Sequence, residues 1–119
     1  FFGHIREDIE CGPCRYCFLN DDEQKKFVRM AFEKAREVAS SGKFDLVVLD
    51  EINVAAKLNF ISVDELIHLI KTKYKNTELI ITGRDAHPQI IELADLVTEM
   101  KLVKHYYNKG VAARRGIEY

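Results

Sequence analysis

The sequence predicts an α/β fold in which helices cover both faces of a mostly parallel sheet, built as a single domain over residues 1–119. Two strongly apolar runs, at residues 44–49 and 78–84, are separated by a segment with helical periodicity. This alternation is typical of right-handed βαβ crossovers, which join parallel strands through a helix. A chain of 119 residues is long enough to bury a hydrophobic core without disulfides or a structural metal.

The overall composition is that of an ordinary globular protein, with 47% hydrophobic and 31% charged residues. The formal net charge of −1 leads us to expect neither nucleic acid nor an anionic membrane as a partner. No apolar run approaches the ~20 residues that span a bilayer, and nothing resembles a signal peptide, so we expect a cytoplasmic protein. The chain begins with Phe1 and not with Met, which suggests a fragment of a longer protein.

The first part of the chain predicts a short strand at residues 1–5, a loop that contains cysteines, and then a long helix. Asn20 and Glu23 have the spacing of a capping box at the start of this helix. We expect Met30 and Phe32 to be packing residues and not ligand contacts. The apolar side chains that share one face of the helix are Phe27, Met30, Ala31, Ala35 and Val38.

The middle of the chain predicts a strand, a connecting segment and a second helix. The strand covers residues 44–49, and the mixed polar and apolar residues 51–60 connect it to the helix. Ser62, with Glu65 three residues later, predicts a second capping box at the start of a helix over residues 62–74. The apolar face of this helix consists of Val63, Leu66, Ile67 and Ile70.

The last part of the chain predicts a strand at residues 78–84, a short helix that begins at Pro88 and runs through Leu93, and a final strand at 95–103. Residues 101–119 are more basic than the rest of the chain. Their charged side chains are Lys101, Lys104, Lys109, Arg114 and Arg115 against the single acid Glu118. Two interpretations stay open for this stretch, a solvated tail or a lid that faces phosphate or carboxylate groups.

All three cysteines lie in one short loop, as Cys11, Cys14 and Cys17. An odd number of cysteines argues against a closed disulfide framework. The C-x2-C-x2-C spacing suits zinc or an iron–sulfur cluster, because thiolates two residues apart in a turn converge on one metal. The fourth ligand would come from His4, another chain or a segment outside this sequence. The alternative is a turn around Gly12-Pro13 with reduced thiols.

Polar side chains follow both predicted strands of the sheet. Asp50 and Glu51 come directly after one strand, and Thr82, Gly83 and Arg84 end the next. Ligands of open α/β sheets bind outside the carboxyl ends of the strands, so these residues are candidates for a site. One of the two acids can direct a hydrated magnesium ion, and Arg84 offers a planar fork for phosphate or carboxylate. The alternative is that the acids only cap the next turn. No G-x-x-x-x-G-K-[ST] loop is present in the 119 residues.

Three segments carry a family resemblance, namely "DLVVLDEIN", "LIITGRDAHPQIIELADLVTEMKLVKH" and "GVAARRGIEY". In order and spacing they resemble the second half of the P-loop ATP:corrinoid adenosyltransferases, the cob(I)alamin adenosyltransferase family. The resemblance covers residues 45–119. It implies a P-loop NTPase fold of the RecA-like type that is incomplete at its N-terminus, because the Walker A loop of the family precedes these elements.

The resemblance implies an enzyme that transfers the 5′-deoxyadenosyl group of ATP to the Co(I) centre of a corrinoid and releases triphosphate, in adenosylcobalamin biosynthesis or salvage. The corrinoid would be cobalamin or a cobyrinate or cobinamide precursor. Glu51 corresponds to the acidic magnesium partner of the family, with Asp50 in support, and Arg84 corresponds to an ATP-side contact. The fragment by itself is expected to be inactive.

The same resemblance suggests further contacts and partners. Lys104 and His105 match the closing segment of the family and would lie near the bound ligands. Tyr16 and Phe18 occupy the region from which family members bring aromatic residues to the corrinoid, although both could equally be packing residues. A homodimer and a reductase that supplies Co(I) are the expected partners. The competing hypothesis is a non-catalytic corrinoid- or metal-binding module that uses the C-x2-C-x2-C loop.

Overall fold

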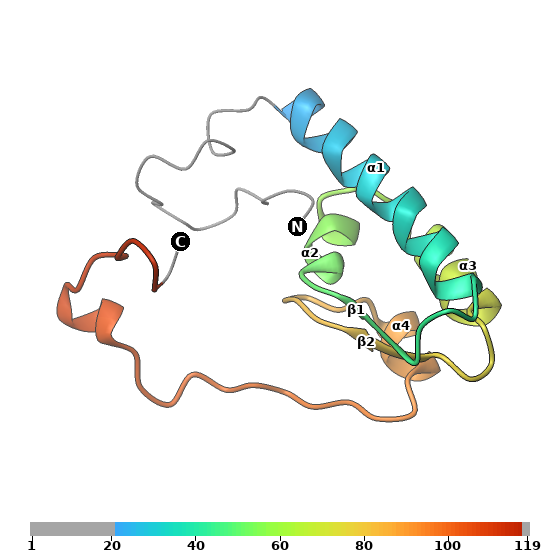
Figure 1. Ribbon diagram of the computed structural model, residues 1–119. Coiled ribbons are helices and arrows are strands. Elements are labelled where there is room, and N and C mark those ends of the chain that lie inside the picture. Colours follow the sequence, from blue (N-terminus) through green and yellow to red (C-terminus); the bar gives the residue numbers. More distant parts are fainter. Residues whose placement is uncertain (1–20, 118–119) are drawn as a thin grey trace.

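The computed structural model describes residues 21–117, which form four helices, two strands and one 3-10 turn (Figure 1). In chain order these are α1 (Asp21–Ser40), β1 (Leu46–Leu49), α2 (Ile52–Lys57), α3 (Val63–Thr72), β2 (Glu78–Ile81), α4 (Pro88–Leu93) and η1 (Tyr106–Lys109). No helix of this described part is long and apolar enough to cross a membrane. The predictions that fall outside it concern the strand at 1–5, His4, Asn20, the cysteines Cys11, Cys14 and Cys17, and the aromatic residues Tyr16 and Phe18.

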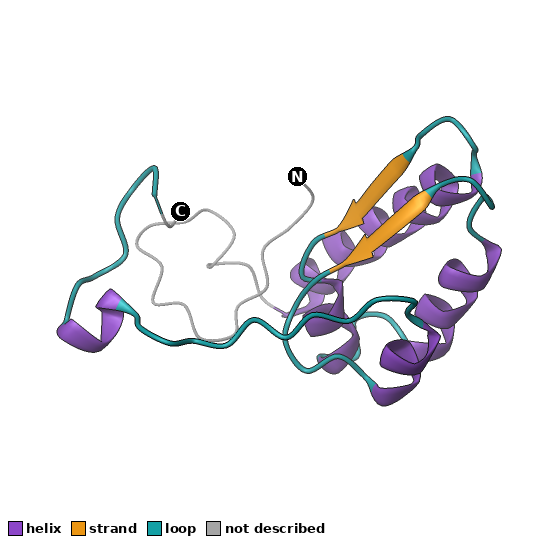
Figure 2. Cartoon of the chain, turned by 90° about the horizontal axis from the view of Figure 1, so that it is seen from below, coloured by secondary structure: helices purple, strands orange, loops and turns teal. Residues whose placement is uncertain are grey.

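The two strands form a parallel sheet, which confirms the α/β class. β1 and β2 pair in register from Leu46 opposite Glu78 to Leu49 opposite Ile81. The strand arrows in Figure 2 point the same way, so both carboxyl ends lie at one edge of the sheet. The residues that follow Leu49 and Ile81 are therefore brought together.

The described helices cover only one face of this sheet. Val47 and Leu49 are buried, whereas Leu46 and Val48 are each 52% exposed. The inward residues of β1 belong to one core cluster with side chains of α1, α2, α3 and α4, including Phe32, Leu66 and Ile90. The expectation of helices on both faces is wrong for residues 21–117, because every helix there contributes to the same core.

Helix α1 packs on a stripe that overlaps the predicted one only in part, because Ala35 and Val38 lie against the core as expected. Val28, Phe32 and Ala39 are buried against the core, which confirms Phe32 as a packing residue. Met30 is 58% exposed and Phe27 is also exposed, so the prediction that they pack inward is wrong. The helix carries apolar residues on adjoining faces, and its contacts with α3 and β1 decide which of them is buried.

Helix α3 begins with the predicted capping box. The Ser62 hydroxyl accepts a hydrogen bond from the Glu65 N–H at 3.2 Å, and the Glu65 carboxylate accepts one from the Ser62 N–H at 2.9 Å. The same carboxylate pairs with Arg29 of α1 at 2.8 Å. Leu66 and Leu69 are fully buried, so Leu69 was missing from the predicted face. The cap of α3 therefore also fixes α1 over the core.

Helix α2 lies in the segment that the sequence predicted as a plain connection. Its six residues are too few to show helical periodicity, although Val54, Ala55 and Ala56 are all buried. Helix α4, in contrast, begins at Pro88 and ends at Leu93 as predicted. Pro88 signals a helix start locally, whereas α2 is stabilised by its contacts with the core.

The strand predicted at residues 95–103 is wrong for the described structure. This segment runs extended along the lower side of Figure 1 and pairs with neither β1 nor β2. Its apolar side chains are exposed, with Val103 at 95%. Alternation in the sequence indicated a strand, but a strand also requires a neighbour that accepts its backbone hydrogen bonds.

The Arg29–Glu65 contact predicts a pH-dependent contribution to stability. Hydrogen bonds from Arg29, and then from Ser62, lower the pKa of Glu65 from 4.5 to about 2. Because the folded pKa lies below the unfolded value, the contribution is complete above pH 4.5 and is lost as the pH falls toward 2. We expect Glu65→Gln to lower the free energy of unfolding at pH 7 by about 1 kcal/mol, since the partly exposed pair is screened. Urea unfolding at pH 7 and at pH 3 measures both effects.

The matched control is Glu37→Gln on α1. Glu37 forms an exposed pair with Lys34 at 2.8 Å, three residues away on the same helix. Such pairs contribute little, so the control should change the unfolding free energy at pH 7 less than Glu65→Gln does. Equal losses in the two variants would contradict the role assigned to Glu65.

Candidate functional site

The carboxyl ends of β1 and β2 are joined through Thr82. The Thr82 hydroxyl donates to the Asp50 carboxylate at 2.6 Å and accepts a hydrogen bond from the Glu51 N–H at 3.0 Å. Its backbone N–H donates to the Leu49 carbonyl at 3.1 Å, which continues the pairing of the strands. We call residues 50–53 and 82–85 the strand-end edge. Sequence reasoning placed Thr82 at this edge without anticipating that it binds both acids.

The two acids that follow β1, Asp50 and Glu51, differ in what holds them. One oxygen of the exposed Asp50 carboxylate, Oδ1, accepts the Thr82 hydroxyl. Glu51 precedes α2 with φ 56° and ψ 20°, a left-handed conformation, and its side chain does not cap the helix. A non-glycine residue in this region costs about 1 kcal/mol. The strained backbone leaves the Glu51 side chain exposed at the edge, where it is accessible to a ligand.

Gly83 allows the second turn to pack directly against the first. Its φ is +121°, and a Cβ at this position would lie 3.1 Å from the Asn53 Cβ and 3.3 Å from the Glu51 Cα. The Asn53 N–H also donates to the Thr82 carbonyl at 3.3 Å. A larger residue at position 83 would therefore push the two strand ends apart.

Arg84 is exposed and lies in the turn between Gly83 and Asp85. An ion pair of 2.9 Å joins the Asp85 carboxylate to Lys57 at the end of α2. Helix α2 thus contacts the turn at both of its ends, through Asn53 and through Lys57. These contacts hold the turn in which Arg84 lies.

Asn53 is a residue of this edge that sequence reasoning missed. It is only 6% exposed, and its side-chain oxygen has no hydrogen-bond partner in the described structure. The one signal in the sequence is an amide side chain inside the apolar run that became α2. Buried polar atoms without partners are rare, so this oxygen needs an explanation.

Lys104 and His105 directly precede the 3-10 turn η1, which lies at the left of Figures 1 and 2, apart from the sheet. His105 caps η1 by accepting the Tyr107 N–H on Nδ1 at 3.0 Å. Its ring stacks on Tyr106 with centroids 4.6 Å apart, and the Arg114 guanidinium lies 5.2 Å from the Tyr106 ring. The structure does not bring Lys104 or His105 together with Asp50, Glu51 and Arg84.

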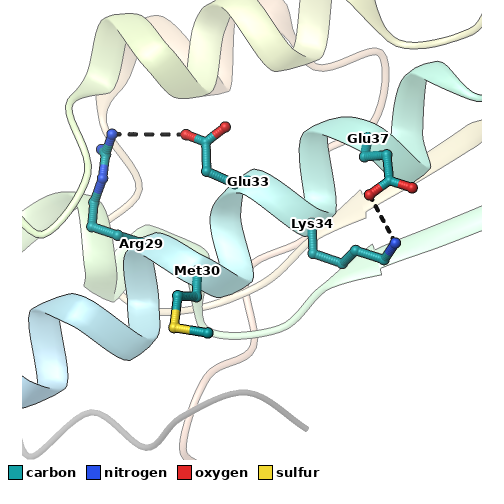
Figure 3. A pocket seen from close by; sticks show the side chains of 5 residues that line it. All are labelled: Arg29, Met30, Glu33, Lys34 and Glu37. Atoms are coloured by element: carbon teal, nitrogen blue, oxygen red, sulfur yellow. Dashed lines mark hydrogen bonds and ion pairs between the residues drawn. The ribbon is translucent and has the colours of Figure 1, made fainter.

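A surface depression lies elsewhere, along the outer side of α1 (Figure 3). Its lining comes from α1 alone, with Met30 between the ion pairs Arg29–Glu33 and Lys34–Glu37. The charged groups there already have ion-pair partners, on α1 itself and, for Arg29, in Glu65 of α3. We assign this depression no role, because none of the residues of the strand-end edge lines it.

Within residues 21–117, no three His, Cys, Asp or Glu side chains converge as a metal site would require. The zinc or iron–sulfur ligands expected at Cys11, Cys14 and Cys17 lie outside this range. Asp50 and Glu51 are two adjacent carboxylates, which suits a cation that keeps most of its ligands as water and phosphate.

Nearly the whole chain matches one protein family. The family model for ATP:corrinoid adenosyltransferase BtuR/CobO/CobP covers residues 4–119. A corrinoid adenosyltransferase of Sinorhizobium sp. is 41% identical over 90 residues, which are 75% of this chain and 42% of the relative. One of Pseudomonas aeruginosa is 38% identical over 123 residues, 100% of this chain and 61% of the relative. One of Escherichia coli K12 is 31% identical over 100 residues, which are 84% of this chain and 51% of the relative. The chain thus spans about half the length of these relatives.

The junction at Thr82 predicts a specific loss of stability. Thr82→Val keeps the shape of the side chain but removes the hydroxyl that joins Asp50 to the Glu51 N–H. We expect the free energy of unfolding to fall by about 1–2 kcal/mol, measured by urea unfolding at pH 7. Thr72→Val is the control, because the Thr72 hydroxyl only donates to the His68 carbonyl within α3. A loss of the same size in the control would refute the special role of Thr82.

Proposed function

Because the chain belongs to the ATP:corrinoid adenosyltransferase family, we propose that it forms part of an enzyme that transfers the 5′-deoxyadenosyl group of ATP to a corrinoid. The observation that carries this proposal is the match of the family over residues 4–119. The strand-end edge supports it, since carboxylates and an arginine lie where α/β sheets bind their ligands. The acceptor is cobalamin or a cobyrinate or cobinamide precursor.

The proposed reaction is a displacement at the C5′ carbon of ATP. The Co(I) centre of the corrinoid supplies the electron pair for a new cobalt–carbon bond. The C5′–oxygen bond breaks, and triphosphate leaves with the electrons of that bond. A reductase that delivers Co(I) is the partner this step requires. The protein contributes orientation of the two substrates and neutralisation of the leaving group.

Glu51 is proposed as the magnesium-side carboxylate of this site. Its carboxylate is exposed at the strand-end edge, while that of Asp50 accepts the Thr82 hydroxyl. Asp50 then supports the site by holding the turn in place. When bound, magnesium would neutralise charge on the triphosphate. The residues present fit such an ion, which prefers a few hard oxygen ligands and keeps several waters.

Arg84 is proposed to contact the phosphates of ATP, because its planar guanidinium binds two phosphate oxygens at once. Lys104 and His105 are proposed contacts of the bound ligands, which requires the basic tail to approach the strand-end edge. Tyr16 and Phe18 are proposed to face the corrinoid. We propose further that residues 1–119 are one domain of RecA-like type and that the enzyme is a cytoplasmic homodimer.

The phosphate-binding loop is proposed to come from polypeptide beyond these 119 residues. No G-x-x-x-x-G-K-[ST] segment occurs in the sequence, and the matched relatives are about twice as long. The gene sequence that encodes Phe1 and its upstream neighbours tests this directly. A phosphate loop upstream in the same reading frame is the expected result.

The activity is tested with the protein encoded by the complete gene. Under anaerobic conditions it is mixed with ATP, magnesium and a reduced corrinoid, and the cobalt–carbon product is followed by its light-sensitive absorbance. Equimolar release of triphosphate completes the balance of the reaction. Corrinoid binding without either product would support the non-catalytic module instead, and metal analysis of the cysteine loop would then identify its ligand.

The role of Glu51 predicts that one substitution preserves the stability of the fold and lowers the activity. Glu51→Gly removes the carboxylate, but glycine adopts the left-handed backbone of position 51 without strain. We expect the free energy of unfolding to stay level or to rise by about 1 kcal/mol. The adenosyl transfer rate should fall at least a hundredfold, since a charge-stabilising contact is worth about 3 kcal/mol.

The control for Glu51 is Glu78→Gln. Glu78 is also exposed and belongs to the same sheet, but it lies at the amino end of β2, opposite Leu46. Its substitution should leave the rate within twofold of that of the unmodified enzyme. A Glu51→Gly enzyme with an unchanged rate would exclude the proposed magnesium role.

A further inference from the structure

Asn53 contains the buried polar atom that the proposed site does not use. Its side-chain oxygen is inaccessible to solvent and accepts no hydrogen bond in the described structure. Leaving a buried acceptor unpaired costs about 1–3 kcal/mol. An apolar residue at this position in α2 would avoid that cost, because Val54, Ala55 and Ala56 next to it are buried in the core. The unpaired amide oxygen therefore destabilises the folded state.

The neighbour of Asn53 is the turn that carries Arg84. Gly83 lies directly against it, so closely that a Cβ on Gly83 would be 3.1 Å from the Asn53 Cβ. The Gly83 N–H donates to no acceptor in the described part of the chain. The buried, unpaired acceptor thus belongs to a residue that contacts Gly83, whose exposed N–H has no protein partner among the described residues. Gly83 has the backbone freedom to rotate this turn, since it carries no side chain.

We infer that Asn53 is a positioning residue: its side-chain oxygen accepts the Gly83 N–H when Arg84 engages the phosphates of a nucleotide. The inference rests on the proposed function, because it assumes that the strand-end edge binds ATP. Asn53 itself is fixed, since its own N–H is bonded to the Thr82 carbonyl. The new bond would hold the turn, and with it Arg84, in the orientation that the phosphates require.

Asn53→Leu separates this role from a purely structural one. Leucine has a similar volume and removes the unpaired acceptor, so the free protein should be as stable as before or more stable. The complex with nucleotide, in contrast, should lose one hydrogen bond. Stability and affinity then change in opposite directions, whereas damage to the fold would lower both.

The experiment uses the protein encoded by the complete gene and magnesium–ATP as the probe. Calorimetry measures the Kd, urea unfolding measures the stability, and NMR follows the hydrogen exchange of the Gly83 amide. In the unmodified protein, magnesium–ATP should slow exchange at Gly83. In Asn53→Leu this protection should disappear and the Kd should rise roughly fivefold, which is the effect of one neutral hydrogen bond. The control Asn76→Leu changes an exposed amide in the turn before β2 and should leave all three quantities unchanged.

Each outcome decides the inference. If magnesium–ATP leaves Gly83 exchange unaltered in the unmodified protein, Asn53 has no positioning role, whether or not the leucine variant folds. If Asn53→Leu binds magnesium–ATP as tightly as the unmodified protein, the inference is also overturned while the proposed function stands. If the unmodified protein binds no magnesium–ATP, the proposed function fails, and the inference fails with it.

Discussion

The strand-end edge depends on one threonine, because every polar group of Thr82 is used to hold it. The N–H donates to Leu49 and the carbonyl accepts from Asn53. The hydroxyl donates to Asp50 and accepts from the Glu51 N–H. A single residue thus determines the path of both chains as they leave the sheet. Glu51 adopts its left-handed conformation next to this junction, and its exposed carboxylate has no protein partner among the described residues.

Local chemistry made parts of the fold predictable, and long-range contacts made other parts unpredictable. Ser62 with Glu65 caps a helix wherever the pair occurs, and Pro88 favours a helix start by itself, so α3 and α4 were predicted correctly. Which face of α1 packs inward depends on its contact with α3, including the Arg29–Glu65 ion pair. The two helices are far apart in the sequence, so a local pattern cannot reveal this contact. The segment 95–103 has strand-like alternation but no neighbour in the described structure with which to pair.

The same distinction applies to the candidate site. That Asp50 and Arg84 would lie at one edge followed from the rule that parallel strands end together. That Thr82 would bridge the two acids, and that Asn53 would be buried beside Gly83, required the register of β1 and β2 to be known. Pairing between distant segments creates these contacts, so the sequence could indicate the place but not its internal bonds.

The sheet face that no described helix covers affects how copies of the chain associate in solution. Leu46, Val48 and Ile80 are each about half exposed on adjacent strands, and both strands have an edge that pairs with nothing in the described residues. Unpaired edges beside apolar side chains favour association between copies of a chain. The net charge of −1 provides little electrostatic repulsion between copies. We therefore expect this polypeptide to associate as its concentration rises. Dilute solutions, or a covalently attached solubilising domain, suit its handling best.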